Sequence, residues 1–191
     1  MRILRPQKRV FLLTAMKEKV IYLLVGPKGS GKSFIGTFLE RTFKFRFVRV
    51  EDRVVEIKEN RQIDDETYIS DAFEAIETEV RNALKQSSII VFESTGLTSS
   101  FDEMVERLKD EFAVIMIGIQ AIDKLCLHRV KTRDQSIHVD VSAEQVRHLN
   151  RQVRIKNIKT DFSLDNNDKT LKDLTAEIHQ IVLQVQNRHL L

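Results

Sequence analysis

Short apolar runs alternate with helical patterns along most of the chain. The runs that predict strands lie at residues 19–25, 45–50, 89–92, 112–119 and 162–164. Apolar residues recur at helical spacing between and after them, at 31–43, 65–86, 99–110, 121–134, 142–159 and 171–186. The run at 89–92 is wholly apolar, which is typical of a strand covered on both faces. The pattern predicts an α/β three-layer sandwich: a five-stranded parallel sheet with helices on both faces.

Two helix starts carry local signals. Ser99 or Ser100 is expected to cap the helix that runs to about residue 110. Ser142-x-x-Gln145 matches a capping box and predicts the start of a basic helix. Ligands of open parallel sheets bind at the carboxyl ends of the strands. The residues that directly follow each predicted strand are therefore the candidates for function.

The clearest chemistry follows the first strand. Residues 26–33 match the phosphate-binding pattern G-x-x-x-x-G-K-S, and they read Gly26-Pro27-Lys28-Gly29-Ser30-Gly31-Lys32-Ser33. Glycines allow successive N–H groups to point at phosphate oxygens, and the helix that starts near Gly31 adds its positive end. We expect Lys32 to reach the β- and γ-phosphates of ATP, Ser33 to ligate Mg²⁺, and the next residue, Phe34, to belong to the nucleotide site.

Carboxylates follow two further strands. Glu93 ends the third strand, where P-loop enzymes place an acid that binds Mg²⁺ directly or through water. Asp52 follows the second strand and is expected to orient the acceptor or take its proton. Its neighbour Glu51 points the opposite way if the strand alternation continues, so only one of the two faces the site.

A pair of arginines predicts a lid. Arg129 and Arg133 are four residues apart and share one helix face, and a polar break follows them. We expect a small lid at about 129–145 that brings both guanidinium groups onto the transferring phosphoryl group. The alternative is an exposed helix face.

Composition narrows the possible functions of the protein only slightly. The 31 Lys and Arg against 28 Asp and Glu give a net charge of +3, which neither requires nor excludes a nucleic-acid partner. The single Cys126 rules out an internal disulfide, suits a cytoplasmic location and is expected to be buried filler. No apolar run approaches the roughly 20 residues of a membrane span. Residues 1–18 form a basic extension, either a targeting peptide or an artefact of an upstream start, before a single domain at 19–191.

The order of these features resembles the P-loop small-molecule and nucleoside kinase superfamily, which includes shikimate, gluconate, adenylate-type and polynucleotide kinases. The resemblance rests on the P-loop, the strand-end Asp52, the Arg129-x-x-x-Arg133 pair and a late strand followed by Asp165-Asn166. It spans about residues 19–187. It implies ATP and Mg²⁺ as cofactors, with adenine between the lid helix and Asp165-Asn166.

The middle of the chain resembles shikimate kinase and also departs from it. Residues 72–84 and 89–92 are similar to that family's long helix and third strand. Glu74, however, stands where that family has a substrate-binding Arg, and Glu93-Ser94-Thr95-Gly96 replaces its triple glycine. The latter stretch resembles ATP-binding proteins near polynucleotide kinases and zeta-type toxins.

These features together predict an ATP- and Mg²⁺-dependent phosphotransferase that acts on a small-molecule or nucleotide-like acceptor. Two alternatives stay open: an ATP-binding regulatory protein with little or no hydrolysis, and a polynucleotide 5′-hydroxyl kinase. Arg53, Arg61 and Arg81 lie in the expected acceptor region. They are either ligands of an anionic acceptor or surface charges.

Overall fold

The fold agrees with the predicted alternation of strands and helices. A computed structural model describes residues 19–50, 66–132, 141–167 and 169–189. Its strands are β1 Val20–Val25, β2 Arg46–Val48, β3 Ile89–Ser94, β4 Ala113–Gln120 and β5 Phe162–Asp165. Its helices are α1 Lys32–Phe43, α3 Glu66–Gln86, α4 Ser99–Glu111, α5 Asp123–Thr132, α6 Ala143–Lys156 and α7 Leu171–His189. Within the described ranges, no helix is both long enough and apolar enough to cross a membrane.

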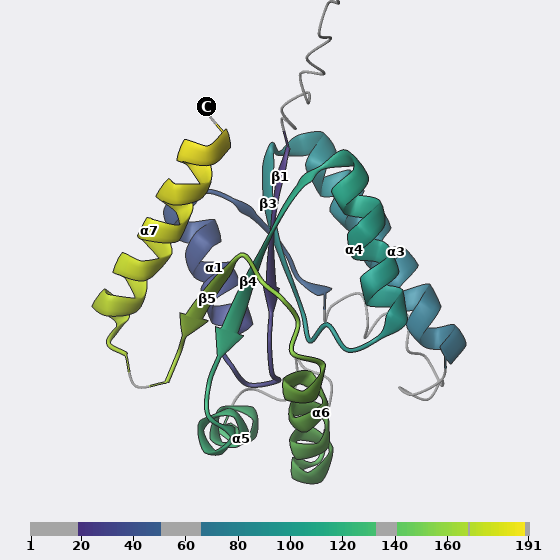
Figure 1. The fold of residues 1–191 in the computed structure, drawn as a ribbon, viewed down its shortest axis with the longest axis vertical. Helices are drawn as coiled ribbons and strands as arrows, with labels where there is room; N and C mark the ends of the chain where they lie inside the picture. Colours follow the sequence, from purple (N-terminus) through teal and green to yellow (C-terminus); the bar gives the residue numbers. More distant parts are fainter. Residues whose placement is uncertain (1–18, 51–65, 133–140, 168, 190–191) are drawn as a thin grey trace, which may run out of the picture.

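All five strands form one parallel sheet, in the order β2-β3-β1-β4-β5. Helices α1 and α7 cover one face and α3 and α4 the other, which gives the three predicted layers (Figure 1). Helices α5 and α6 lie beyond the edge at which the strands end (Figure 1). The predicted α/β sandwich is therefore confirmed, and it places β1 and its following loop at the centre of that edge.

The two-sided cover explains why β1 is apolar throughout. Ile21 and Leu23 pack in the core under α3 and α4, whereas Tyr22 and Leu24 pack in the core under α1 and α7. Successive side chains of a strand point to opposite faces, so both sets must be apolar when both faces are covered. All four side chains are at most 1% exposed.

Several element ends differ from the sequence prediction, among them that of β2, which ends at Val48 and not at residue 50. Thr98 caps α4, since its hydroxyl accepts the Phe101 N–H at 3.2 Å, and Ser99 is already the first helical residue. Strand β3 ends at Ser94, one residue after Glu93, and both residues continue the register with β1. Helix α6 ends at Lys156, before the predicted residue 159, because Asn157 adopts the left-handed conformation with φ 44°. The predicted capping box at Ser142 is confirmed.

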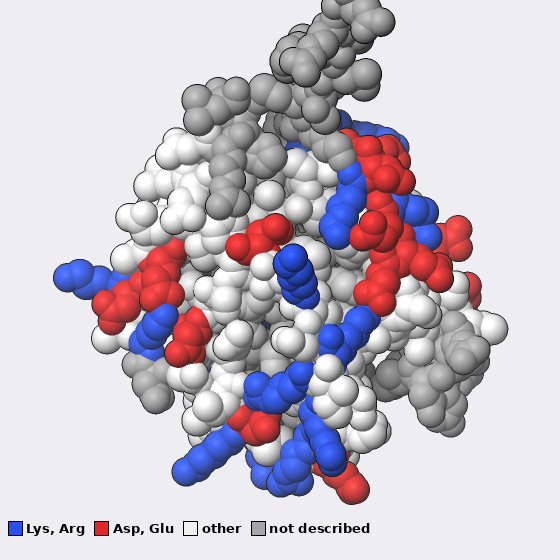
Figure 2. Space-filling view, viewed as in Figure 1, with Lys and Arg blue, Asp and Glu red and all other residues white. Residues whose placement is uncertain are grey.

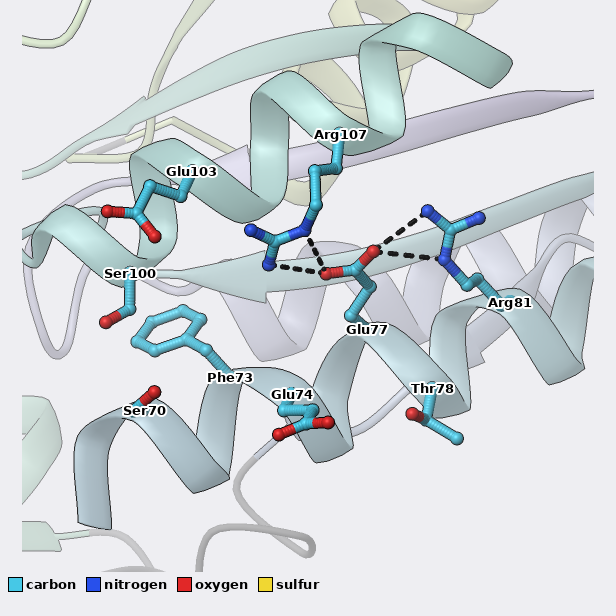
Figure 3. A pocket seen from close by; sticks show the side chains of 9 residues that line it. All are labelled: Ser70, Phe73, Glu74, Glu77, Thr78, Arg81, Ser100, Glu103 and Arg107. Carbon is cyan, nitrogen blue, oxygen red and sulfur yellow. Dashed lines mark hydrogen bonds and ion pairs between the residues drawn. The ribbon is translucent and has the colours of Figure 1, made fainter. Parts of the chain in front are cut away.

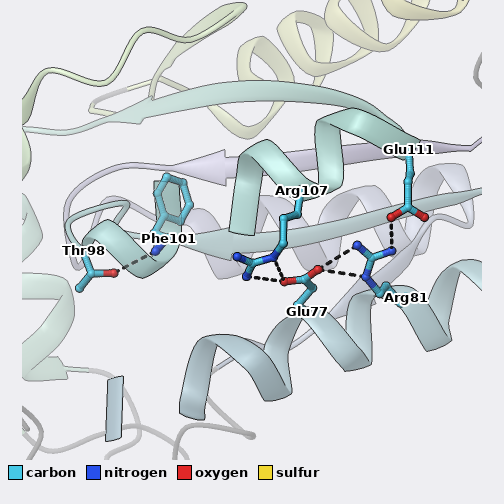
Figure 4. Close-up of polar contacts among 6 residues, drawn as sticks. All are labelled: Glu77, Arg81, Thr98, Phe101, Arg107 and Glu111. Carbon is cyan, nitrogen blue, oxygen red and sulfur yellow. Dashed lines mark hydrogen bonds and ion pairs between the residues drawn. The ribbon is translucent and has the colours of Figure 1, made fainter. Parts of the chain in front are cut away.

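An ion-pair network joins α3 to α4, the two helices that cover one face of the sheet (Figure 4). The Glu77 carboxylate accepts hydrogen bonds from Arg81 at 2.8 and 3.0 Å and from Arg107 at 2.7 and 2.9 Å. Arg81 also donates to Glu111 at 2.8 Å. Glu77 is only 9% exposed and lines a pocket of about 470 Å³ between the two helices (Figure 3). The network therefore satisfies a carboxylate that interrupts the apolar stripe of α3.

The two arginines change the acid–base behaviour of Glu77. Burial alone would raise the pKa of this carboxyl, but the hydrogen bonds and charges of Arg107 and Arg81 outweigh burial and hold its pKa below the usual value. A lowered folded-state pKa stabilises the fold above the ordinary Glu pKa. That stabilisation disappears as the pH falls through the folded-state value.

We therefore predict that Glu77→Gln lowers the free energy of unfolding at pH 7 by about 1–2 kcal/mol, the scale of charge-assisted hydrogen bonds to partly exposed partners. The loss should shrink as the pH falls from about 5 to 3, because the wild-type carboxyl then becomes protonated. Urea unfolding at several pH values measures both effects. Glu74→Gln, at an exposed position of the same helix, is the control and should change stability by less than about 0.5 kcal/mol. Equal effects of the two variants would contradict the role given to Glu77.

Candidate functional site

The phosphate-binding loop lies where the strand order of the sheet reverses. Strand β1 has β3 on one side and β4 on the other, and the loop leaves its carboxyl end to enter α1. Ligands of open parallel sheets bind at such a point. Gly31 is the N-cap of α1, so the positive end of this helix faces the loop.

Donors from α1, from α5 and from the residue after β5 bind carbonyl oxygens of the loop. Lys32 is 7% exposed, and its ammonium donates to the carbonyls of Gly26 and Pro27, both at 2.9 Å. The Ser30 carbonyl accepts from Asn166 Nδ2 at 2.7 Å and from Arg129 at 3.3 Å. Side chains thus bind the loop through its carbonyl oxygens. This arrangement leaves backbone N–H groups for a ligand.

Two glycines permit this close packing. Gly29 has φ 83°, and a Cβ there would lie 2.3 Å from the carbonyl oxygen of Cys126 on α5. Gly31 has φ 97°, and a Cβ there would lie 2.2 Å from Asn166 Nδ2. Any other residue would strain the backbone and push α5 or Asn166 away.

A hydroxyl–carboxylate pair lies beside the loop. Ser33 Oγ donates to Glu93 Oε1 at 2.7 Å, and Glu93 pairs in register with Leu24, close to the end of β1. Both groups offer oxygen ligands, the kind that Mg²⁺ prefers. The two predicted metal residues, from the loop and from β3, therefore lie within hydrogen-bonding distance of each other.

The loop also has the chemistry that a phosphate needs. Ser30 is fully buried, and its Oγ is the one buried side-chain oxygen or nitrogen of the described residues without a hydrogen-bond partner. Cationic side chains gather over α5 and α6, the helices next to the loop, on the face shown in Figure 2. Arg129 of α5 is the one that contacts the loop, through Ser30, and it also donates to the Asn166 carbonyl at 3.0 Å. The residues present therefore fit a polyphosphate.

The remaining predicted residues are placed unevenly. Asn166 is buried against the loop, Asp165 is exposed, and Phe34 is 52% exposed at the start of α1. Their contacts with a nucleotide remain a prediction. Asp52 and Glu51, together with Arg53 and Arg61, lie outside the described residues. So do Arg133 and residues 133–140 of the predicted lid.

Two further residues of the sequence analysis make structural contacts. Arg81 donates to Glu77 and to Glu111, the last residue of α4, so it lies toward the opposite edge of the sheet from the loop. A contact with an acceptor stays a prediction. Cys126 is buried as expected; burial raises the pKa of its thiol, and its backbone packs against Gly29.

The sequence prediction missed Asn150 of α6. This side chain is 1% exposed and makes two hydrogen bonds with the backbone of Lys28, at 2.8 and 3.0 Å. A signal was present in the sequence, since Asn150 lies between Val146 and Val153 on the face that α6 buries. A polar residue within an apolar stripe requires a partner, and here the partner is the loop.

Solved structures of kinases share this fold. A putative kinase from Chloroflexus aurantiacus superposes with a TM-score of 0.65 at 15% identity, over 87% of this chain and 98% of that one. Shikimate kinase from Acinetobacter baumannii in complex with shikimate gives a TM-score of 0.58 at 17% identity, over 89% and 96%. The Mycobacterium tuberculosis APS kinase in complex with AMPPNP and APS gives 0.58 at 12% identity, over 87% and 98%. At these identities, the similarity shows the fold alone.

Sequence comparison supplies the family. No curated protein matches the chain. A family model described as shikimate kinase matches residues 28–185, which include most of the phosphate-binding loop and every described strand after it. The match covers well over half of the 191 residues. With its P-loop, its strand order and its kinase-like fold, the chain belongs to the shikimate kinase family of P-loop kinases.

Proposed function

We propose that the protein transfers the γ-phosphate of ATP, with Mg²⁺, to a small-molecule or nucleotide-like acceptor. Membership in a kinase family supports phosphoryl transfer. The observation that carries the proposal is the 2.7 Å contact of Ser33 with Glu93 beside the Lys32 ammonium. Two oxygen ligands for a metal and a cation for phosphates thus lie at the same edge of the sheet, where the strands end. Phosphoryl transfer requires such a combination.

Each group has a distinct role in this proposal. The backbone of Gly29–Ser33 holds the phosphates, and Lys32 neutralises the charge of the β- and γ-phosphates. Ser33 and, directly or through water, Glu93 hold Mg²⁺, which neutralises charge on the phosphate oxygens when bound. Asp52 orients the acceptor hydroxyl, and Arg129 with Arg133 stabilises the charge of the transferring group.

The acceptor is the open part of the proposal. By resemblance, Glu74 takes the position of an arginine that binds substrate in shikimate kinases. In this structure Glu74 is exposed and lines the pocket between α3 and α4 (Figure 3). An acid in place of that arginine removes a cation that would attract a carboxylate-bearing acceptor. Shikimate therefore belongs in an acceptor screen as one candidate rather than as the assigned substrate.

We predict that Lys32→Ala weakens ATP binding strongly and abolishes ATP turnover, because the ammonium that faces the phosphates is lost. The fold should persist, since the bonds of the Lys32 ammonium to the Gly26 and Pro27 carbonyls lie within the loop. Calorimetry with Mg·ATP measures the affinity, and thermal unfolding checks the fold. Lys124→Ala removes an exposed cation from α5 and is the control for general charge effects. Wild-type ATP affinity in Lys32→Ala would remove the central claim.

We predict transfer of label from γ-labelled ATP to one member of an acceptor panel. The panel contains shikimate, gluconate, APS, nucleosides and an oligonucleotide with a free 5′-hydroxyl. With the accepted substrate, Asp52→Asn should lower kcat by roughly 10²-fold, the scale of general acid–base groups, and leave ATP affinity nearly unchanged. Glu51→Gln is the matched control. If ATP binds but the full panel receives no label, the ATP-binding regulatory protein becomes the better account.

A further inference from the structure

We infer that Asn150 is a positioning residue that fixes the backbone of the phosphate-binding loop at Lys28 for phosphate binding. The inference rests on the proposed function, because it assigns the loop to ATP phosphates. Asn150 touches no reacting atom in this scheme and acts only through the loop.

The Asn150 amide binds both backbone groups of Lys28. Asn150 Oδ1 accepts the Lys28 N–H at 2.8 Å, and Asn150 Nδ2 donates to the Lys28 carbonyl at 3.0 Å. Both polar ends of one amide thus bind the two backbone groups of one residue, 122 positions away in the chain. Two bonds to one residue fix its orientation as well as its distance. Among uncharged side chains of this length, only an amide supplies both an acceptor and a donor.

Packing alone does not require an amide at this position. Val146, Asn150 and Val153 are the buried residues of α6. Leucine has the same four side-chain heavy atoms in the same branched arrangement as asparagine and would complete this apolar face without burying polar atoms. The amide is therefore explained by its partner in the loop and not by the packing of α6.

Helix α6 also makes hydrogen bonds and ion pairs to segments other than the loop. Lys156 at its end contacts the Asp102 carboxylate at 2.7 and 2.8 Å, and Arg154 donates to Asp123 at 2.7 Å and to the Ala121 carbonyl at 2.9 Å. These bonds attach the helix to α4 and to the start of α5 without the loop. Loss of the Asn150 amide should therefore free the loop more than it frees the helix.

Several backbone groups of the loop are bound by the protein itself. Because Asn150 occupies the Lys28 N–H, that donor is not available to a phosphate. Gly29 packs directly on Cys126, and Ser30 is held through its carbonyl by Arg129 and Asn166. Asn150 thus completes a series of protein contacts at three consecutive loop residues, 28–30.

Hydrogen exchange of the protein without nucleotide tests the inference directly. In Asn150→Leu, the amide of Lys28 should exchange about fivefold faster or more, the equivalent of one lost neutral hydrogen bond. Mg·ATP should bind about tenfold more weakly, while the melting temperature stays close to that of the wild type. Asn150→Ala should accelerate loop exchange in the same way. Val146→Ala is the matched control, and it should lower the melting temperature while loop exchange and ATP affinity stay unchanged.

Several outcomes would overturn the inference. One is wild-type exchange at Lys28 in both Asn150 variants. Another is equal acceleration in Val146→Ala, since the effect would then belong to the packing of α6. Global unfolding of both Asn150 variants would make the residue structural only. The exchange measurement needs neither nucleotide nor acceptor, so an acceptor screen without a product would refute the proposed function and leave this test intact.

Discussion

The arrangement around the site follows from one constraint on the backbone. A loop that turns N–H groups toward a ligand turns carbonyl oxygens toward the protein, and a buried carbonyl requires a donor. In this chain the donors come from α1, α5, α6 and the residue after β5. Each of these elements must approach the loop to within hydrogen-bonding distance. The helices at this edge of the sheet thus lie where they can donate hydrogen bonds to the carbonyl oxygens of the loop.

Much of this site could be predicted because its residues obey local rules. The loop has a fixed pattern, and Glu93 follows an apolar strand that must end at the same edge as β1. Asn166 was found by the same strand-end rule, and Arg129 by helical spacing. In each case, neighbouring residues in the sequence carry enough information to place the side chain near the loop.

Contacts between distant segments were harder to predict. Glu77 and Asn150 each interrupt an apolar stripe of a helix, and both are buried with partners on other elements. A single sequence shows such an interruption but does not show which segment packs against it. The cap of α4 at Thr98 was missed for a smaller reason, since Thr98, Ser99 and Ser100 all have suitable hydroxyls. Only the backbone conformation distinguishes them.

The long sequence separation of the loop contacts has a consequence for the order of folding. The partners of the Lys28 and Ser30 backbones lie 122 and 136 positions further along the chain. Contacts of such separation form late, because a large loop of chain must close before they contribute. During synthesis from the N-terminus, the phosphate-binding residues emerge well before the partners that fix their final shape. A nascent chain that ends before α5 therefore contains the complete binding motif but lacks Arg129, Asn150 and Asn166, three of the donors that shape it.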